Sequence, residues 1–394
     1  IANIDILKGL AATTLYGTEG RNGVILITTK TGSSKNLASK QEIEISSSYF
    51  FNEVASLPDY QNSFGGGFNQ ADADGWFYSN WGPGFYKDGL GGWGTFINDE
   101  NDDAGFNSDG TLAHPYSTSS FLSGVTGADA VWAEQFQGQR YDWKPRNSVK
   151  EFFRVGGVAV NAVNLRGRSE DNKYNYGMAF GHLNDKGFTP GNEVSRSNLT
   201  VSGGGNLTNK INVKGSLNYT LTNMKTPPVN TSFGSSSYGA GSSIFGDLFY
   251  TPRSIDIQGL PFEMPSGGSI YYRDDNAIQH PLWTAKNAKF SQKVNRINGY
   301  AAVDFNLTDK INLLYQASLD NYTEENVNRQ NRGGVTGTIA VDRGFLYTYT
   351  NTNTIFDHKL VLSGNNYSVF NDYLNIGFLA GATSRSTDFN KTGV

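Results

Sequence analysis

NLTNKINVKGSLNYTL, residues 206–221, is the stretch that decides the fold. From Ile211 to Leu221 the odd positions are apolar or Gly, and the even positions are polar. A period of two is typical of a β-strand whose two faces meet different surroundings. The heptapeptide 206–212 at its start predicts a tight turn between two strands. Residues 306–312 read NLTDKIN and also precede an alternating run, so the same turn and strand recur.

Outward from this hairpin, runs of the same kind predict nine strands: 42–51, 152–167, 174–183, 198–207, 211–221, 298–307, 311–322, 356–369 and 373–388. Further tight turns are expected at 169–172 and 370–373, and the long connections are 52–151, 184–197, 222–297 and 323–355. Short turns that alternate with long loops are the topology of an outer-membrane β-barrel. The polar face is rich in Asn, Lys, Ser, Gln and Asp, which suits a wet lumen. A soluble sandwich rarely has such long loops at one end only.

The composition agrees with an all-β class and excludes several others. Gly numbers 47 and Tyr plus Phe number 46 in 394 residues, whereas Met numbers 3 and Cys 0. A net charge of −4 without a basic run argues against nucleic-acid binding. The absence of Cys excludes disulfides and thiolate metal sites. No run of about 18 apolar residues is present, so we expect no transmembrane helix.

The first 33 residues differ from the rest of the chain. Residues 23–30 form a nearly continuous apolar run, which predicts a strand buried on both faces. Residues 34–41 read as a polar linker, and the period of two begins after it. We therefore expect three parts, at 1–33, 34–41 and 42–394.

A family resemblance emerges from these first residues. The segments Ile4–Gly9, Leu15–Gly17 and Gly20–Lys30 closely resemble the end of the plug domain in TonB-dependent receptors, above all the SusC/RagA group of Bacteroidetes. Segments 57–62, 80–83, 149–190 and 280–283 resemble later parts of that group in the same order. Leu10 and Ala12 depart from its usual Pro and Ser. The motif residues, with a structural or gating role implied, are Lys8, Gly9, Tyr16, Gly17, Gly20, Arg21, Asn22 and Gly23.

The resemblance implies a partial transmembrane antiparallel β-barrel of about nine of 22 strands, preceded by a small α+β plug-domain remnant. It implies TonB-dependent import of a large nutrient, a glycan or a peptide, across the bacterial outer membrane, with no cofactor. The implied partners are a SusD-like surface lipoprotein acting as a lid, the TonB–ExbB–ExbD complex, outer-membrane lipid and the substrate. Because nine strands cannot close such a barrel, we expect the chain to be a fragment that is incomplete alone.

Aromatic residues of the loops are the candidate ligand contacts. Trp76, Tyr78, Trp81 and Trp93 crowd the first loop, where they either stack on substrate or pack within the loop. Rings at strand ends are expected to form an interfacial girdle: Tyr49, Tyr174, Tyr219, Tyr322 and Tyr367. Asp99, Asn101 and Asp103 have the alternate spacing of a calcium loop, but the following Gly falls one place late, which favours a solvated acidic loop.

Enzyme signatures are missing. The four histidines stand far apart without metal-ligand spacing, and the Gly-Gly runs lack the Lys-Ser/Thr of a phosphate loop. We therefore expect a transporter that is not an enzyme. A surface-binding or adhesion barrel without active uptake is the alternative, and a TonB box upstream would distinguish the two.

Overall fold

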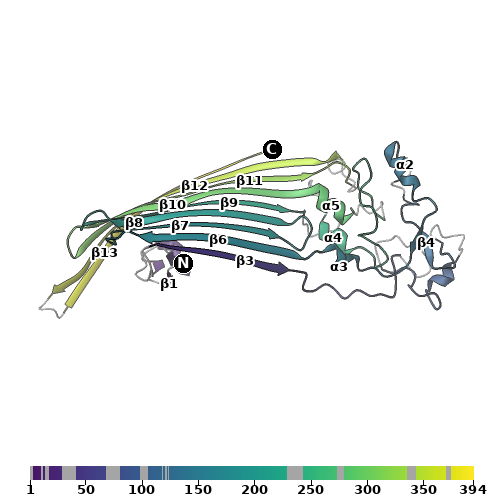
Figure 1. Ribbon diagram of the computed structural model, residues 1–394, viewed down its shortest axis with the longest axis horizontal. Coiled ribbons are helices and arrows are strands. Elements are labelled where there is room, and N and C mark those ends of the chain that lie inside the picture. Colours follow the sequence, from purple (N-terminus) through teal and green to yellow (C-terminus); the bar gives the residue numbers. More distant parts are fainter. Residues whose placement is uncertain are drawn as a thin grey trace.

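The computed structural model describes residues 3–9, 12–13, 17–28, 41–67, 80–97, 105–117, 119, 122, 124–228, 243–272, 279–334, 343–369 and 374–394. Within these ranges a curved antiparallel sheet of nine strands carries long connections at one end (Figure 1). The strand order is β13-β12-β11-β10-β9-β8-β7-β6-β3. The strands are β3 (Gln41–Asn52), β6 (Gly156–Arg168), β7 (Tyr174–Lys186), β8 (Glu193–Asn206), β9 (Ile211–Thr226), β10 (Ala288–Asn306), β11 (Ile311–Gln330), β12 (Phe345–Val369) and β13 (Leu374–Gly393).

The nine predicted strands are confirmed, and the two similar heptapeptides form the same turn. Thr208 accepts hydrogen bonds on Oγ1 from the N–H groups of Lys210 and Ile211 at 3.2 and 3.1 Å. Thr308 accepts from the equivalent N–H groups at 3.2 and 3.0 Å. A short polar side chain thus satisfies the turn backbone in both places. This local chemistry explains why the repeat predicted the hairpins correctly.

Three strands extend well into segments predicted as loops. Strand β10 begins at Ala288 rather than at 298, β11 continues to Gln330 rather than 322, and β12 begins at Phe345 rather than 356. In β10 and β11 the alternation of apolar and polar residues ends before these added residues, and in β12 the polar run 351–354 interrupts it. The hydrogen-bonded ladder continues without it, because backbone pairing needs no apolar face.

The long connections at one end of the sheet pack into a folded body. We call it the cap, and it consists of the described parts of residues 53–155 and 243–287. Its core joins two loops that are far apart in sequence, with Phe106, Tyr116 and Trp143 from the first and Ile255 and Tyr271 from the second. These side chains are almost completely buried. Burial of many large rings is the main source of the cap's stability. The two longest connections therefore form one folded unit.

Short elements punctuate the cap. They are η2 (Trp93–Phe96), β4 (Thr111–Ala113), α2 (Ala128–Glu134), β5 (Arg140–Asp142), α3 (Ser148–Phe152), α4 (Ile244–Phe249) and α5 (Pro281–Asn287). Strands β4 and β5 pair antiparallel. Helix α5 begins where sequence rules place a start, since Pro281 occupies its first turn and Nδ1 of His280 accepts the N–H of Leu282 at 3.2 Å. No helix in the described ranges is long and apolar enough to cross a membrane.

The amino-terminal residues form a separate two-stranded sheet of β1 (Asn3–Leu7) and β2 (Val24–Thr28), with η1 (Gly17–Asn22) between them. Strand β2 was predicted to be buried on both faces, and this is wrong in the described structure. Ile25 is 65% exposed and Leu26 40% exposed. Two strands provide only one ladder, and no layer of described residues packs against these faces.

Candidate functional site: the two faces of the sheet and the cap

One face of the sheet, the outer face, is apolar. Leu217 of β9 lies directly opposite Val201 of β8 and Gly299 of β10, so the odd positions of β9 continue onto both neighbours. The outer-face positions within 43–51, 157–165, 174–182, 197–205, 211–221, 297–305, 313–319, 356–362 and 378–386 carry no Asp, Glu, Lys or Arg. We call this region the apolar band. At the ~40° tilt of barrel strands, a stretch such as 211–221 spans about 25 Å, which matches the lipid-facing band of a barrel.

The opposite, inner face carries charges in cross-strand pairs. The strands of the apolar band carry four ion pairs here: Arg166–Glu42 at 2.5 Å, Lys214–Asp304 at 3.3 Å, Arg296–Asp320 at 2.6 Å and Arg385–Asp357 at 2.8 Å. Pairs this exposed add little stability, so their value lies in keeping the wall hydrated without net charge. The predicted polar inner face is confirmed.

Amides and hydroxyls link the strands between these charges. Thr200 donates to Oδ1 of Asn218 at 2.8 Å, and Asn218 donates to Oδ1 of Asn298 at 2.9 Å. The inner face therefore offers both donors and acceptors along its length. Asn326 and Asn351 both donate to one carboxylate oxygen of Glu324 nearer the cap, at 2.6 and 3.0 Å.

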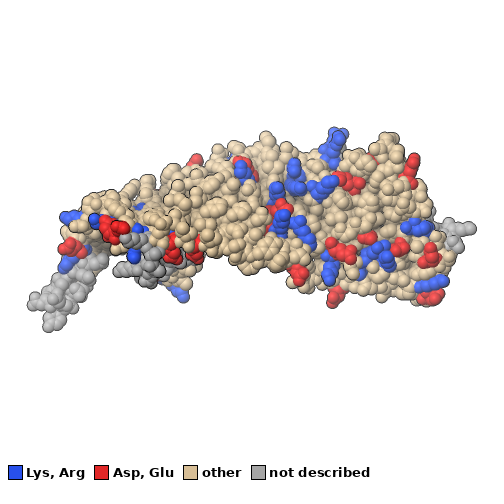
Figure 2. Space-filling view, viewed as in Figure 1, with Lys and Arg blue, Asp and Glu red and all other residues tan. Residues whose placement is uncertain are grey.

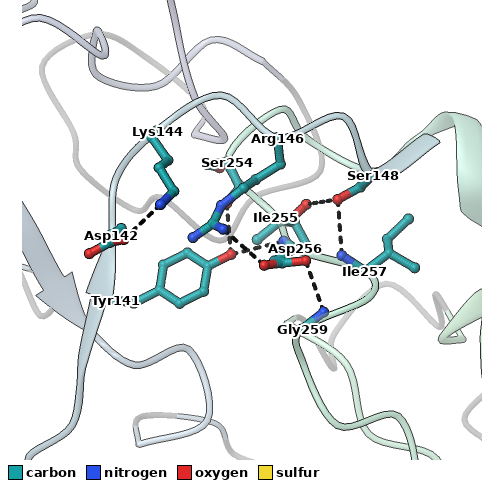
Figure 3. Close-up of polar contacts among 10 residues, drawn as sticks. All are labelled: Tyr141, Asp142, Lys144, Arg146, Ser148, Ser254, Ile255, Asp256, Ile257 and Gly259. Atoms are coloured by element: carbon teal, nitrogen blue, oxygen red, sulfur yellow. Dashed lines mark hydrogen bonds and ion pairs between the residues drawn. The ribbon is translucent and has the colours of Figure 1, made fainter. Parts of the chain in front are cut away.

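A group of polar contacts joins the two loops of the cap (Figure 3). The buried Tyr141 hydroxyl donates to the carbonyl of Ser254 at 2.9 Å and accepts the N–H of Asp256 at 2.8 Å. Burial raises the pKa of Tyr141, so the hydroxyl stays protonated and keeps donating. Arg146 forms an ion pair with Asp256 at 2.9 Å, and Ser148 donates to the carbonyl of Ile255 at 2.6 Å. The second loop is thereby fixed to the first at consecutive residues.

Arg253 is a second link and is 7% exposed. Its guanidinium donates to the carbonyls of Gln61 and Arg146 and to the side-chain oxygens of Asn62 and Asn147. The planar fork of Arg suits such multidirectional donation. Burial lowers its pKa from an ordinary value far above neutrality, so the group remains charged. Arg253 therefore fixes three segments of the cap.

A cavity of about 560 Å³ lies beside this link, between residues 53–62 and helix α3. Tyr60, Lys150, Arg154 and Arg253 line it, together with apolar groups such as Phe153. Glu53 and Asp59 also line it, so its rim carries both charges beside aromatic rings, which is a surface able to hold a polar ligand. Sequence reasoning missed it because no local pattern marks Arg253 or Lys150.

Two buried histidines of the cap are neutral. Burial lowers the pKa of His114 to about 4 and that of His280 to about 3. His114 packs on Phe136, with ring centroids 4.8 Å apart, and His280 packs on Tyr271 at 4.4 Å. Both imidazole rings therefore pack as uncharged members of the cap core. Among the residues that the structure describes, no group of three or more His, Asp or Glu is placed to hold a metal ion.

The predicted ligand contacts differ in how far the structure exposes them. Trp93 is partly buried against the cap core and stacks on Phe106, with centroids 6.0 Å apart. Trp81 is 62% exposed. Trp76 and Tyr78 lie outside the described residues, as do the calcium candidates Asp99, Asn101 and Asp103.

The predicted girdle tyrosines do not all lie on the same face of the sheet. Tyr49, Tyr174 and Tyr219 lie on the outer face, at the margins of the apolar band. Tyr322 does not, because it lies directly opposite Arg296 on the inner face. The girdle prediction for Tyr322 is therefore wrong, since one residue along a strand changes the face. The side chain of Tyr367 lies outside the described residues.

The motif residues near the amino terminus surround a close approach of two chain segments. Gly20 is buried, and a Cβ there would lie 2.4 Å from the carbonyl oxygen of Ala12. Gly9 and Gly23 have φ of +53° and +93°, a conformation that favours glycine. Lys8, Arg21 and Asn22 are exposed, Gly17 opens η1, and Tyr16 lies outside the described residues.

A sheet with a charge-free apolar band on one face and paired charges on the other has the two-faced pattern of a transmembrane β-barrel wall. No family model matches the chain. Among curated proteins, TonB-dependent receptor P3 of Formosa agariphila is 42% identical over 59 residues, which is 15% of this chain and 6% of that protein. The chain thus spans a small part of that relative.

Solved structures match nearly the whole chain. The RagAB peptide importer aligns over 99% of it in both the 'open-open' and the 'closed-closed' state, with TM-scores of 0.62 and 0.60 and 13% sequence identity. The chain covers 42% of the length of those chains. The resemblance to SusC/RagA-like TonB-dependent transporters is thereby confirmed, and the fold is that of part of their barrel. None of these matched proteins is named as an enzyme, in agreement with the absence of catalytic motifs.

Proposed function

We propose that the chain forms part of the wall and the extracellular cap of a TonB-dependent importer of the bacterial outer membrane, which takes up a large nutrient, a glycan or a peptide. The observation that carries the proposal is the two-faced sheet, apolar outside and ion-paired inside, in a fold that matches the RagAB peptide importer over 99% of the chain. A passive pore and an adhesion barrel share the wall. The match to an importer favours this proposal over both.

The described residues would hold the barrel wall in the membrane and line a polar route for the substrate. The apolar band would stay in lipid, and the inner face would line the route of the substrate with paired charges and amides that hydrogen-bond to polar solutes. No covalent step is involved. Residues 1–33 would belong to the plug, with Gly20 and Gly23 allowing the close packing that a displaceable plug needs.

The cap would face the outside, and the tight turns would face the periplasm. A SusD-like surface lipoprotein would cover the cap as a lid, and the TonB–ExbB–ExbD complex would supply energy for uptake. Trp81 would contact the substrate, because an aromatic ring 62% exposed on a folded cap is available for stacking on sugars or peptide side chains. Trp76 and Tyr78 share this proposal.

The test uses the full-length protein in its native host. Deletion of the gene should abolish uptake of a labelled glycan or peptide, and the wild-type gene should restore it only in cells that retain TonB. A stoichiometric lipoprotein should co-purify in mild detergent. Uptake that continues without TonB would contradict the proposal and favour a passive surface barrel.

A matched pair of variants tests the contact role of the exposed ring. Trp81→Ala should weaken uptake at low substrate concentration by about tenfold, the loss expected for one stacked aromatic group. Leu90→Ala removes a side chain that is 93% exposed on the same loop and should leave uptake unchanged. Equal effects of the two substitutions would remove Trp81 from the binding surface.

A further inference from the structure

The outer face changes character where the strands continue beyond the apolar band. Ser291 of β10 lies there with four cations around it. Lys225 lies directly opposite on β9, Lys289 and Lys293 are the next outer-face residues along β10, and Arg329 lies diagonally across on β11. Neighbours at these positions are about 5 to 8 Å apart at Cβ, within reach of long side chains. We call these five residues the basic cluster.

The arrangement of charge in the basic cluster is unfavourable by itself. Lys289 and Arg329 lie directly opposite each other as a cross-strand pair. Like charges placed this way repel. Neither of them, nor Lys225, forms an ion pair with any described residue. An anion between the strands would convert this repulsion into attraction.

Acidic neighbours do not supply that anion. On strands β8 to β11 this part of the outer face carries two acids, Glu325 and Glu193. Glu325 pairs with Lys293 at 3.9 Å. Glu193 lies opposite Lys225 without an ion pair between them. Four cations against two acids leave the region with an excess of positive charge.

The level of the basic cluster relative to the apolar band indicates the kind of anion. Lys225 lies four residues beyond Leu221, and Lys293 lies four residues beyond Ile297, the last apolar outer-face positions of β9 and β10. Four residues of a tilted strand rise about 10 Å along the membrane normal. By the same rise Lys289, eight residues beyond Ile297, lies about 20 Å beyond the band. The basic cluster therefore begins at the outer edge of the headgroup region, about 5–8 Å thick, into which long Lys and Arg side chains can reach back. Figure 2 shows Lys and Arg gathered where the sheet meets the cap, beyond a stretch of the sheet with few charges.

We propose that the basic cluster binds the phosphorylated headgroup of an outer-leaflet lipid. The proposal rests on the proposed orientation, with the cap outside. Lysine ammonium groups would act as point charges on the phosphate, the Arg329 fork would donate two hydrogen bonds, and the Ser291 hydroxyl would donate one. The lipid chains would lie along the apolar band below. A bound lipid would thus hold the barrel wall at a fixed depth in the leaflet.

The test is native mass spectrometry of the full-length protein in neutral detergent, with bisphosphorylated lipid A as the probe and dephosphorylated lipid A as its comparison. The variant combines Lys225→Gln, Lys289→Gln and Arg329→Gln. Wild-type protein should retain the phosphorylated probe, and the variant should bind it about a hundredfold more weakly. Dephosphorylated lipid should bind weakly to both proteins.

Two controls separate this site from general charge effects and from misfolding. Lys173→Gln, Lys210→Gln and Lys310→Gln together remove the same number of cations from the turns and should leave binding unchanged. A charge-conserving variant with Lys225→Arg, Lys289→Arg and Arg329→Lys should retain binding. Equal binding of the phosphorylated lipid by wild type and by the neutralised variant would overturn the proposal. Because binding is measured without TonB, it can fail while uptake persists, or persist while uptake fails.

Discussion

Replacing Arg253 by Met should loosen the cap, because it removes a buried donor that joins three segments and leaves the packing volume almost unchanged. The side chain makes four hydrogen bonds to protein oxygens. A hydrogen bond from a charged donor contributes about 1 kcal/mol or more net, and an acceptor left buried without a partner adds to the loss. We expect a loss of about 3–4 kcal/mol in the free energy of opening of the cap. A loss of this size identifies a link between segments rather than a surface contact.

The assay is native-state hydrogen exchange of the full-length protein. Amides whose hydrogen bonds depend on the linked segments should report the opening, such as the N–H of Gly66, which donates to Ser254 at 2.9 Å, and the N–H of Phe85, which donates to the carbonyl of Ser63 at 2.9 Å. Their exchange should accelerate about 10² to 10³-fold, since each 1.4 kcal/mol is a factor of ten.

Arg154→Met provides the matched control for this substitution. Arg154 is exposed, and its side chain makes one hydrogen bond, to the carbonyl of Gly187 at 3.0 Å. Its replacement should change exchange by less than about tenfold. If Arg253→Met leaves the cap amides within about threefold of wild type, the reasoning about buried hydrogen bonds in the cap is refuted.

Three further perturbations follow from the described contacts. Acid should destabilise the cap. Its two buried histidines have pKa values of about 4 and about 3 in the folded cap, whereas in the unfolded chain they take up protons below about pH 6.5. The stability that they contribute above about pH 6.5 is therefore lost as the pH falls toward about 3. His280→Gln should flatten this dependence in hydrogen exchange, and an unchanged slope would contradict it. Leu217→Arg should cost the barrel about 2–4 kcal/mol in urea unfolding from bilayers. Ser216→Arg, on the inner face opposite Ser202, should cost less than about 1 kcal/mol, and equal costs would count against the assignment of faces. Gly65→Val should disrupt the cap core, because a Cβ there would lie 2.2 Å from the ring of Trp143. The tryptophan emission should shift to the red as that ring becomes exposed. An unshifted emission would mean that the site accommodates the valine side chain.

The sheet could be predicted from the sequence because the patterns that indicate its strands and turns lie within short segments. The alternation from Ile211 to Leu221 and the repeated turn with Thr208 and Thr308 need no distant partner to be recognised. The strand ends were less predictable, because the ladder outlasts the alternation: at 321–325 in β11 the outer face becomes polar while pairing with β12 continues. Face assignment also fails locally, as it did for Tyr322.

The cap could not be predicted, because its core and its links join loops that are far apart in sequence and have no period. Tyr141 meets Ser254 across 113 residues, and Arg253 meets Gln61 across 192. No pattern in either loop marks these partners. The packing of Trp93 on Phe106 was one of two alternatives open from sequence, and only the fold places those rings together.

The most direct test of the central claim, that this sheet is a barrel wall between lipid and water, is a nitroxide scan of β9. Residues 1–394 contain no cysteine, so once any cysteine elsewhere in the full-length protein is replaced by serine, single cysteines at 213–220 can each carry a spin label in a lipid bilayer without a background signal. Labels at odd positions should collide with oxygen dissolved in lipid, and labels at even positions with a water-soluble nickel chelate. A scan without this period of two, or with the two faces exchanged, would show that the sheet is not a wall between lipid and water.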